Sequence, residues 1–186
     1  MSKSASNVKT LREVNKARWL TVTAIFMALN IIMSMSFLAI PLPTGHHLYL
    51  CDTVINTAAL LLDPVAAFIV GGVGSFLGDM MFYPQAMFVS LVAHGLQAVA
   101  VSLIAHTGNN STKQTRFLRS LVATLVGAVI MVVGYTLGKT FVYSTFEAAM
   151  LKLPFEILQG LLGVFGSLLL CYKAGLAKIF KAMELE

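Results

Sequence analysis

The sequence predicts an all-α polytopic membrane protein, a bundle of six transmembrane helices. Of its 186 residues, 58% are hydrophobic and only 11% are charged, and the mean hydropathy is +0.83. A water-soluble fold could not bury so much apolar surface. Long apolar windows lie between Ala17 and Ala174, and most basic residues fall outside them. These observations identify the lipid bilayer as the solvent of the chain.

The first three helices follow from the length of the windows and from the prolines between them. A hydrocarbon core of about 30 Å requires about 20 apolar residues per helix. The first window, 19–40, ends before Pro41 and Pro43, because proline cannot continue a helix. The second window, 50–62, is short and stops at Asp63-Pro64, which turns the chain into the third, 65–82.

The last three helices are separated by similar signals. Pro84 divides the third window from the fourth, 85–104, and the polar run 107–114 marks a loop before the fifth. The fifth window covers 118–143, and the sixth, 155–172, begins just after Pro154.

Orientation follows from the positions of lysine and arginine near the helix ends. With both termini in the cytoplasm, only Lys139 and Lys152 lie outside. The other eleven lie inside: Lys3, Lys9, Arg12, Lys16, Arg18, Lys113, Arg116, Arg119, Lys173, Lys178 and Lys181. The asymmetry predicts two cytoplasmic termini, and it accounts for the net charge of +5 without a nucleic-acid partner. We expect a basic segment at 1–17, a membrane domain at 18–178 and a cytoplasmic tail at 179–186.

Small residues recur at spacings that allow helix backbones to approach closely. In the first helix, Ala24 and Ala28 lie one turn apart on one face. Glycines do the same in the third and sixth helices, at Gly71, Gly74, Gly78, Gly160 and Gly163. Packing within the bundle explains such motifs, and the alternative is a docking face for another subunit.

Polar residues inside the windows indicate a binding site, since an ionisable group at the centre of a span costs about 2.5 to 3.5 kcal/mol. On the fourth helix, Ser90, His94 and Gln97 share one face. On the sixth, Glu156 and Gln159 lie near the outer end. These two faces predict a pocket that opens outward.

Two further acidic residues, Asp52 and Asp79, lie near helix ends. Capping or pairing inside the bundle and a role in the site both remain open for them.

Catalytic and metal-binding motifs are absent from the sequence. It contains no GxxxxGKS phosphate loop, no GxSxG elbow and no HExxH pair. His46 and His47 have no other ligands nearby in sequence, and Cys51 and Cys171 are expected at opposite ends of the bundle. We therefore expect no metal site, no disulfide and no cofactor in this chain.

One long segment resembles a known family. The run IPLPTGHHLYLCDTVINTAALLLDPVAAFIVGGVGSFLGDMMF, from Ile40 to Phe82, is similar to the S components of energy-coupling factor (ECF) vitamin transporters, in the branch with riboflavin, hydroxymethylpyrimidine and pantothenate proteins. The IPxPxG loop, the Asp that opens the second helix and GGVGSxLGD carry the likeness, and the segment LPFEILQGLLG, 153–163, also fits. This chain departs from the family pattern at Cys51 where glycine is usual, at Asp63 before Pro64, and at His94 where lysine is frequent.

The resemblance implies a transport subunit without its own motor, in a prokaryotic plasma membrane. Such a subunit captures a vitamin outside, docks on a transmembrane coupling subunit bound to two cytosolic ATPase subunits that use ATP, and topples to release its cargo. The coupling subunit would contact Ala24 and Ala28. Loops over the pocket would form a lid that includes His46, His47, Tyr83 and Gln85.

The pocket residues favour a neutral aminopyrimidine or pyridoxine-like ring as the ligand. Glu156 would accept a hydrogen bond, and Tyr135 would stack on the ring. The alternative, pantothenate, needs a cation such as Lys139, Lys152 or a histidine. The full candidate set is His46, His47, Tyr83, Gln85, Ser90, His94, Gln97, Tyr135, Lys139, Glu156 and Gln159.

Two other classes of protein remain as alternatives. A membrane-embedded enzyme would use Asp79, His94 and Glu156, but the missing catalytic motifs argue against it. In a purely structural subunit, the polar faces would carry an unexplained energetic cost.

The charge asymmetry predicts the topology directly. A cysteine substituted for Ser4 should be protected from an impermeant thiol reagent in intact cells, whereas a cysteine at His47 should be labelled, because the first lies inside and the second outside. Labelling at position 4 in intact cells would contradict this orientation.

Overall fold

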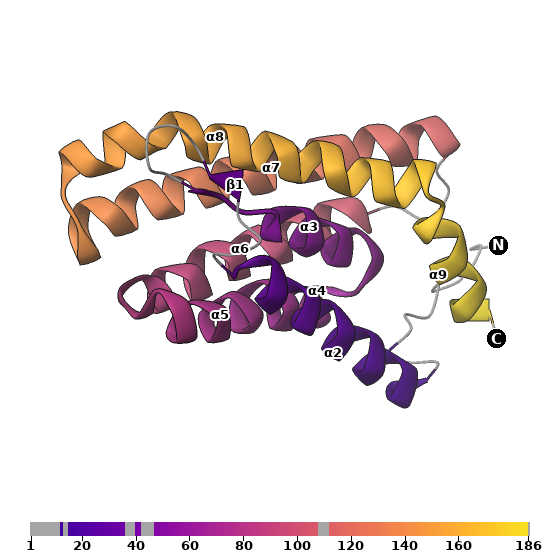
Figure 1. Cartoon of the computed structure of the whole chain (residues 1–186). Coiled ribbons are helices and arrows are strands. Elements are labelled where there is room, and N and C mark those ends of the chain that lie inside the picture. The colour runs from indigo at the N-terminus through magenta and orange to yellow at the C-terminus, as the bar shows by residue number, and fades with distance from the viewer. Residues whose placement is uncertain (1–11, 13–14, 36–39, 42–46, 108–111, 186) are drawn as a thin grey trace, which may run out of the picture.

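The chain forms a helical bundle in the computed structural model, which describes residue 12 and residues 15–35, 40–41, 47–107 and 112–185 (Figure 1). Five of the described helical segments are long and apolar enough to cross a membrane: Lys16–Met33, Pro64–Phe82, Pro84–Ala105, Lys113–Tyr143 and Phe146–Lys173. A shorter apolar helix, α3 (Cys51–Leu61), lies among them. The predicted all-α polytopic fold is confirmed.

Several spans contain more than one helical type. The third span consists of α4 (Pro64–Phe68), the π-helical turn η2 (Ile69–Val73) and α5 (Gly74–Phe82). The fourth joins the short 3-10 turn η3 (Pro84–Ala86) to α6 (Met87–Ala105). The last two, α7 (Lys113–Gly138) and α8 (Phe146–Leu168), end in the π-helical turns η4 (Lys139–Tyr143) and η5 (Leu169–Lys173), and they lie side by side along the bundle (Figure 1).

The boundaries differ from the expected windows at the first and sixth helices. Helix α2 (Lys16–Met33) ends at a turn at Ser34, before the expected end at residue 40. Two short strands follow, β1 (Ile40–Pro41) and β2 (His47–Leu48), which pair antiparallel. Helix α8 begins at Phe146 rather than 155 and contains Pro154. A membrane helix tolerates an internal proline when other groups or water satisfy the freed carbonyl, so Pro154 does not mark the helix start.

Helix α3 lies at the centre of the bundle, and α2 lies at its periphery. Eight of the eleven residues of α3 are buried, including Ile55, Ala58 and Ala59 at 0% exposure. In α2 only Thr23 and Asn30 are buried. Asn30 Nδ2 donates to the Val70 carbonyl of the π-helical turn η2 at 2.8 Å. Trp19 donates to the Asp63 carboxylate, and Phe26 packs against the core cluster, so both polar and apolar contacts attach this peripheral helix.

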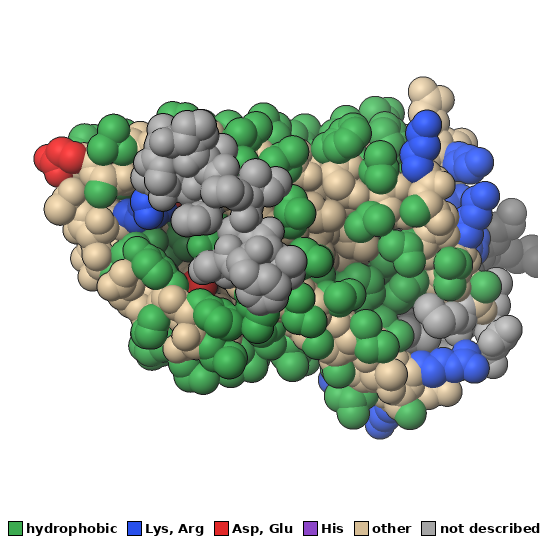
Figure 2. Space-filling view, viewed as in Figure 1, with side chains coloured by type: hydrophobic (Ala, Val, Ile, Leu, Met, Phe, Trp, Pro, Cys, Tyr) green, Lys and Arg blue, Asp and Glu red, His purple; other side chains and the backbone are tan. Residues whose placement is uncertain are grey.

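Helix α9 (Leu176–Leu185) follows the last span and crosses the boundary that we predict between the membrane domain and the tail. Phe180 is buried, and its ring lies 6.0 Å from that of Phe26 in α2. Lysine and arginine side chains gather at the end of the molecule where α9 lies, whereas apolar side chains cover its length (Figure 2). The cytoplasmic location of that end stays a prediction from this charge asymmetry.

Candidate functional site

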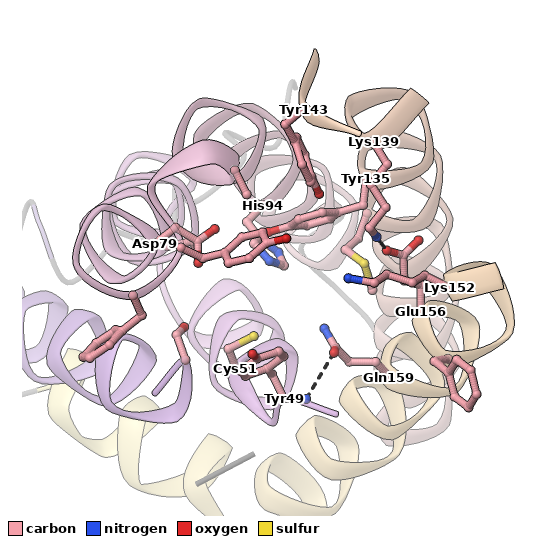
Figure 3. Close-up of a pocket in the computed structure, with 17 residues that line it drawn as sticks. Tyr49, Cys51, Asp79, His94, Tyr135, Lys139, Tyr143, Lys152, Glu156 and Gln159 are labelled. Carbon is pink, nitrogen blue, oxygen red and sulfur yellow. Dashed lines mark hydrogen bonds and ion pairs between the residues drawn. The ribbon is translucent and has the colours of Figure 1, made fainter. Parts of the chain in front are cut away.

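A cavity of about 270 Å³ lies between α3, α5, α7 and α8 (Figure 3). Aromatic and ionisable side chains from all four helices converge on it. Its lining residues are Ser34, Tyr49, Cys51, Ser75, Asp79, Phe82, Tyr83, Ala86, His94, Met131, Tyr135, Lys139, Tyr143, Lys152, Phe155, Glu156 and Gln159. A mixed lining of this kind is typical of a small-molecule site.

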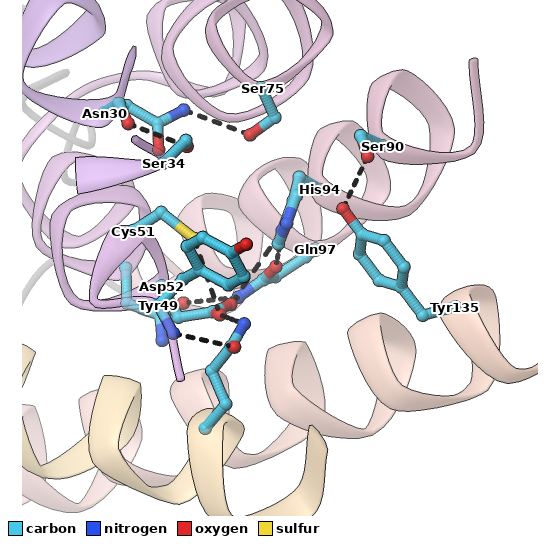
Figure 4. Close-up of polar contacts among 12 residues, drawn as sticks. Asn30, Ser34, Tyr49, Cys51, Asp52, Ser75, Ser90, His94, Gln97 and Tyr135 are labelled. Carbon is cyan, nitrogen blue, oxygen red and sulfur yellow. Dashed lines mark hydrogen bonds and ion pairs between the residues drawn. The ribbon is translucent and has the colours of Figure 1, made fainter. Parts of the chain in front are cut away.

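Cys51, His94 and Gln159 form one side of the cavity, which we call its floor, and the buried carboxylate of Asp52 lies behind it (Figure 4). Its Oδ1 accepts a hydrogen bond from Gln97 Nε2 at 2.9 Å, and its Oδ2 accepts one from Gln159 Nε2 at 2.7 Å. The side-chain oxygen Oε1 of Gln159 accepts in turn from the Tyr49 backbone amide at 3.1 Å, and Gln97 Oε1 lies 2.7 Å from His94 Nδ1. These contacts join α3, α6, α8 and the segment before α3.

A second polar group lies on the opposite side of His94. Ser90 donates to the Asp79 carboxylate, and its oxygen lies 2.5 Å from the Tyr135 hydroxyl. The Tyr135 ring meets the His94 imidazole edge to face, with centroids 5.2 Å apart. The two polar groups therefore hold the imidazole between them and present it to the cavity.

Lys139 and Glu156, whose side chains are 7% and 12% exposed, form an ion pair in the lining of the cavity. Lys139 belongs to the π-helical turn η4, and its ammonium also lies 5.4 Å from the centroid of the Tyr135 ring. One oxygen of Glu156, Oε2, is buried and has no hydrogen-bond partner among the described residues. A buried acceptor without a partner is costly, so this oxygen is available to a ligand.

The structure brings most of the sequence candidates together. The cavity is lined by six of them: Tyr83, His94, Tyr135, Lys139, Glu156 and Gln159. Ser90 and Gln97 lie behind the lining and bond to it, Ser90 to Asp79 and Gln97 to His94. Gln85 is exposed and is not among the lining residues. The backbone of His47 belongs to β2, and His46 lies outside the described residues.

Several cavity residues carry no distinct signal in the sequence. Tyr143 ends the π-helical turn η4 and Phe155 lies inside α8, and neither differs in type from the aromatic residues around it in the sequence. Lys152, which the sequence suggests only as a cation for pantothenate, also lines the cavity from α8. Cys51 reaches the cavity from the first turn of α3, a position that its departure from the family pattern could have indicated. Asp79, for which two roles were open, both pairs with Ser90 and lines the cavity.

The predicted docking pair lies elsewhere on the surface. Ala24 and Ala28 are exposed on α2, and neither lines the cavity. The face that they share is therefore available to a neighbouring helix.

Gly163 allows α8 to lie directly against the Asp52 network. A methyl group at this position would fall 2.6 Å from Asp52 Cβ and 3.2 Å from the Asp52 backbone carbonyl carbon. No side chain can retreat to relieve such a contact, because the opposing atoms belong to or adjoin the backbone. Close helix packing at Gly163 thus sets the position of Asp52.

The sequence of this chain is similar to those of known proteins. A family model described as "ECF-type riboflavin transporter, S component" matches residues 14–178. A protein of Pyrococcus woesei, described as an uncharacterized protein in a gap 3' region, is 35% identical over 97 residues. Those residues make up 52% of this chain and 62% of that relative, so the chain spans less than two thirds of the relative's length.

Substitution of Gly163 by alanine should displace Asp52 and lower the stability of the purified chain by about 1 to 3 kcal/mol, the usual cost of overpacking. Gly160→Ala on the same helix is the matched control, because the nearest atoms that its methyl group would meet are the Ala128 Cβ at 3.2 Å and the flexible Met131 Cε at 3.4 Å. Thermal unfolding in detergent should show the larger loss for Gly163→Ala. Equal losses of stability in the two variants would mean that the contact with Asp52 adds nothing to the cost of a methyl group on α8.

Proposed function

This chain belongs to the family of S components of ECF-type transporters, and we propose that it is the substrate-binding membrane subunit of a vitamin uptake system. The cavity would receive a vitamin or vitamin precursor from outside the cell. A transmembrane coupling subunit and cytosolic ATPase subunits would supply the energy, since the sequence holds no phosphate loop. Membership in a family of transporter components also favours a role without catalysis.

The ligand that we propose is a neutral aminopyrimidine or pyridoxine-like ring that donates hydrogen bonds. The unpartnered Oε2 of Glu156 is the observation that carries this proposal. A ring amino or hydroxyl group that donates to it would satisfy a buried acceptor. Because Lys139 already balances the charge of Glu156, the ligand needs no positive charge of its own.

The rest of the lining suits a ring. Tyr83, Tyr135 and Tyr143 all face the cavity, and aromatic side chains stack on planar heterocycles. Gln159 and His94 supply further polar contacts on the floor. Orientation of the ring would then follow from Glu156 at one side and the floor at the other.

Pantothenate is the second candidate, and Lys152 favours it. This lysine also lines the cavity, so a carboxylate ligand would find a cation there in addition to Lys139. The two candidates differ in the charge that the site must accept, and charge can therefore separate them.

Glu156→Gln should lower the affinity for a ring ligand about tenfold to a hundredfold, because it weakens a charge-assisted hydrogen bond worth about 1.5 to 3 kcal/mol. For pantothenate the same change should preserve or raise the affinity, since it removes a repulsive charge and releases Lys139. Titration of the purified wild type and variant with hydroxymethylpyrimidine, pyridoxine, pantothenate and riboflavin shows whether the affinity falls or rises.

The matched control for this titration is Glu147→Gln, an exposed glutamate at the start of the same helix. It should leave every affinity unchanged. Unchanged affinity of Glu156→Gln for every compound that binds would remove Glu156 from the site.

Ala24→Trp or Ala28→Trp should abolish uptake by the assembled transporter while the isolated chain still binds its ligand. A bulky side chain would hold two helix backbones apart at this exposed pair, which lies away from the cavity. Val122→Trp, at an exposed position of α7, is the control and should transport normally. Loss of ligand binding in detergent would place the two alanines in the bundle rather than in a docking face.

Purification of the chain alone, followed by mass spectrometry of the small molecules that it retains, tests the proposed function most directly. A retained vitamin-like compound supports it. A compound that is chemically converted during incubation would favour a membrane-embedded enzyme instead, and the absence of binding to any vitamin would favour a structural subunit.

A further inference from the structure

We propose that the floor of the cavity binds a divalent transition-metal ion through Cys51, Asp52 and His94. Cys51 and Asp52 are neighbours at the start of α3, whereas His94 lies beyond the third span, and the sequence alone predicts no metal site from them. The fold brings a thiol, a carboxylate and an imidazole together at one point, all of them buried. The inference goes beyond the proposed function and does not depend on which vitamin is bound.

The separation of the donor atoms suits a single small ion. All three lie within 4.8 Å of one another. His94 Nδ1 is 3.8 Å from Asp52 Oδ1, and Cys51 Sγ is 3.9 Å from Asp52 Oδ2. Tetrahedral zinc, with bonds of about 2.0 to 2.3 Å, places its ligand atoms about 3.3 to 3.8 Å apart. Small side-chain rotations would therefore complete the site.

The charge of Asp52 provides a reason for a cation at this position. Its side chain is fully buried. Among the described residues, Asp52 forms an ion pair only with His94, and the imidazole is charged only when it is protonated. Buried charges in proteins are usually paired or coordinate metals, and a divalent ion would balance both the Asp52 carboxylate and a Cys51 thiolate.

The surrounding amides already form a supporting shell. Gln97 and Gln159 each donate to one oxygen of Asp52, and each oxygen keeps a further lone pair for an ion. Gln97 Oε1 also lies beside His94 Nδ1. Coordination through Nδ1, the nitrogen that lies 3.8 Å from Asp52 Oδ1, would replace this contact with Gln97.

Three protein ligands would leave one position of a tetrahedral ion open toward the cavity, because Cys51 and His94 both line it. The combination of sulfur, nitrogen and oxygen donors suits zinc, cobalt and nickel better than magnesium or calcium. A nitrogen or oxygen of a small molecule in the cavity could occupy the open position.

Cobalt(II) is the probe that tests the site, since a thiolate bound to it gives a charge-transfer absorption. The purified, metal-free chain should bind one Co²⁺ with this absorption, and Zn²⁺ should displace it. Cys51→Ser should abolish the absorption. Cys171→Ser is the matched control and should retain it, because the other described cysteine packs in a separate apolar cluster with Leu61 and Phe180.

His94→Gln should weaken Co²⁺ binding at least about tenfold, as expected for the loss of a ligand, and thermal unfolding verifies that each variant is folded. The proposal is overturned if the wild-type chain does not bind one Co²⁺, if Cys51→Ser keeps the absorption, if Cys171→Ser loses it, or if His94→Gln binds as the wild type does. Vitamin titration of the metal-free chain is a separate measurement, so either proposal can fail without the other.

Discussion

The buried carboxylate of Asp52 is the interaction on which the arrangement of the site depends. Amides from α6 and α8 donate to its two oxygens, and Gly163 permits α8 to approach it without an intervening side chain. A charge at 0% exposure is stable only when such donors are fixed in place. The same contacts that satisfy Asp52 therefore hold three helices in register and set the floor of the cavity.

Much of the fold could be predicted from the sequence because the bilayer imposes a simple rule on apolar length. The short second window became α3, and basic residues gather at one end of the molecule in Figure 2. Proline was a less reliable guide. Helix α2 ends at Met33, several residues before Pro41, whereas Pro154 lies inside α8. The effect of a proline depends on whether neighbouring groups satisfy the carbonyl that it leaves free.

The candidate site could be predicted only where its residues share one helix face. Ser90, His94 and Gln97 are spaced so that periodicity alone puts them together, and the structure buries all three. The pairing of Lys139 with Glu156 depends instead on the π-helical turn η4 and on the contact between two long helices. The convergence of Asp52 and Gln159, 107 residues apart, likewise follows from packing that no local pattern encodes.

The shortness of α3 has a consequence for the permeability of the membrane. Eleven residues rise only about 16 Å, roughly half of a hydrocarbon layer of about 30 Å, and the cavity begins where α3 does. Below it, Ile55, Ala58 and Ala59 are sealed at 0% exposure. Buried side chains of α3 thus close the cavity at this depth. Among the described residues, the packing around α3 therefore offers a solute no open path beyond the cavity.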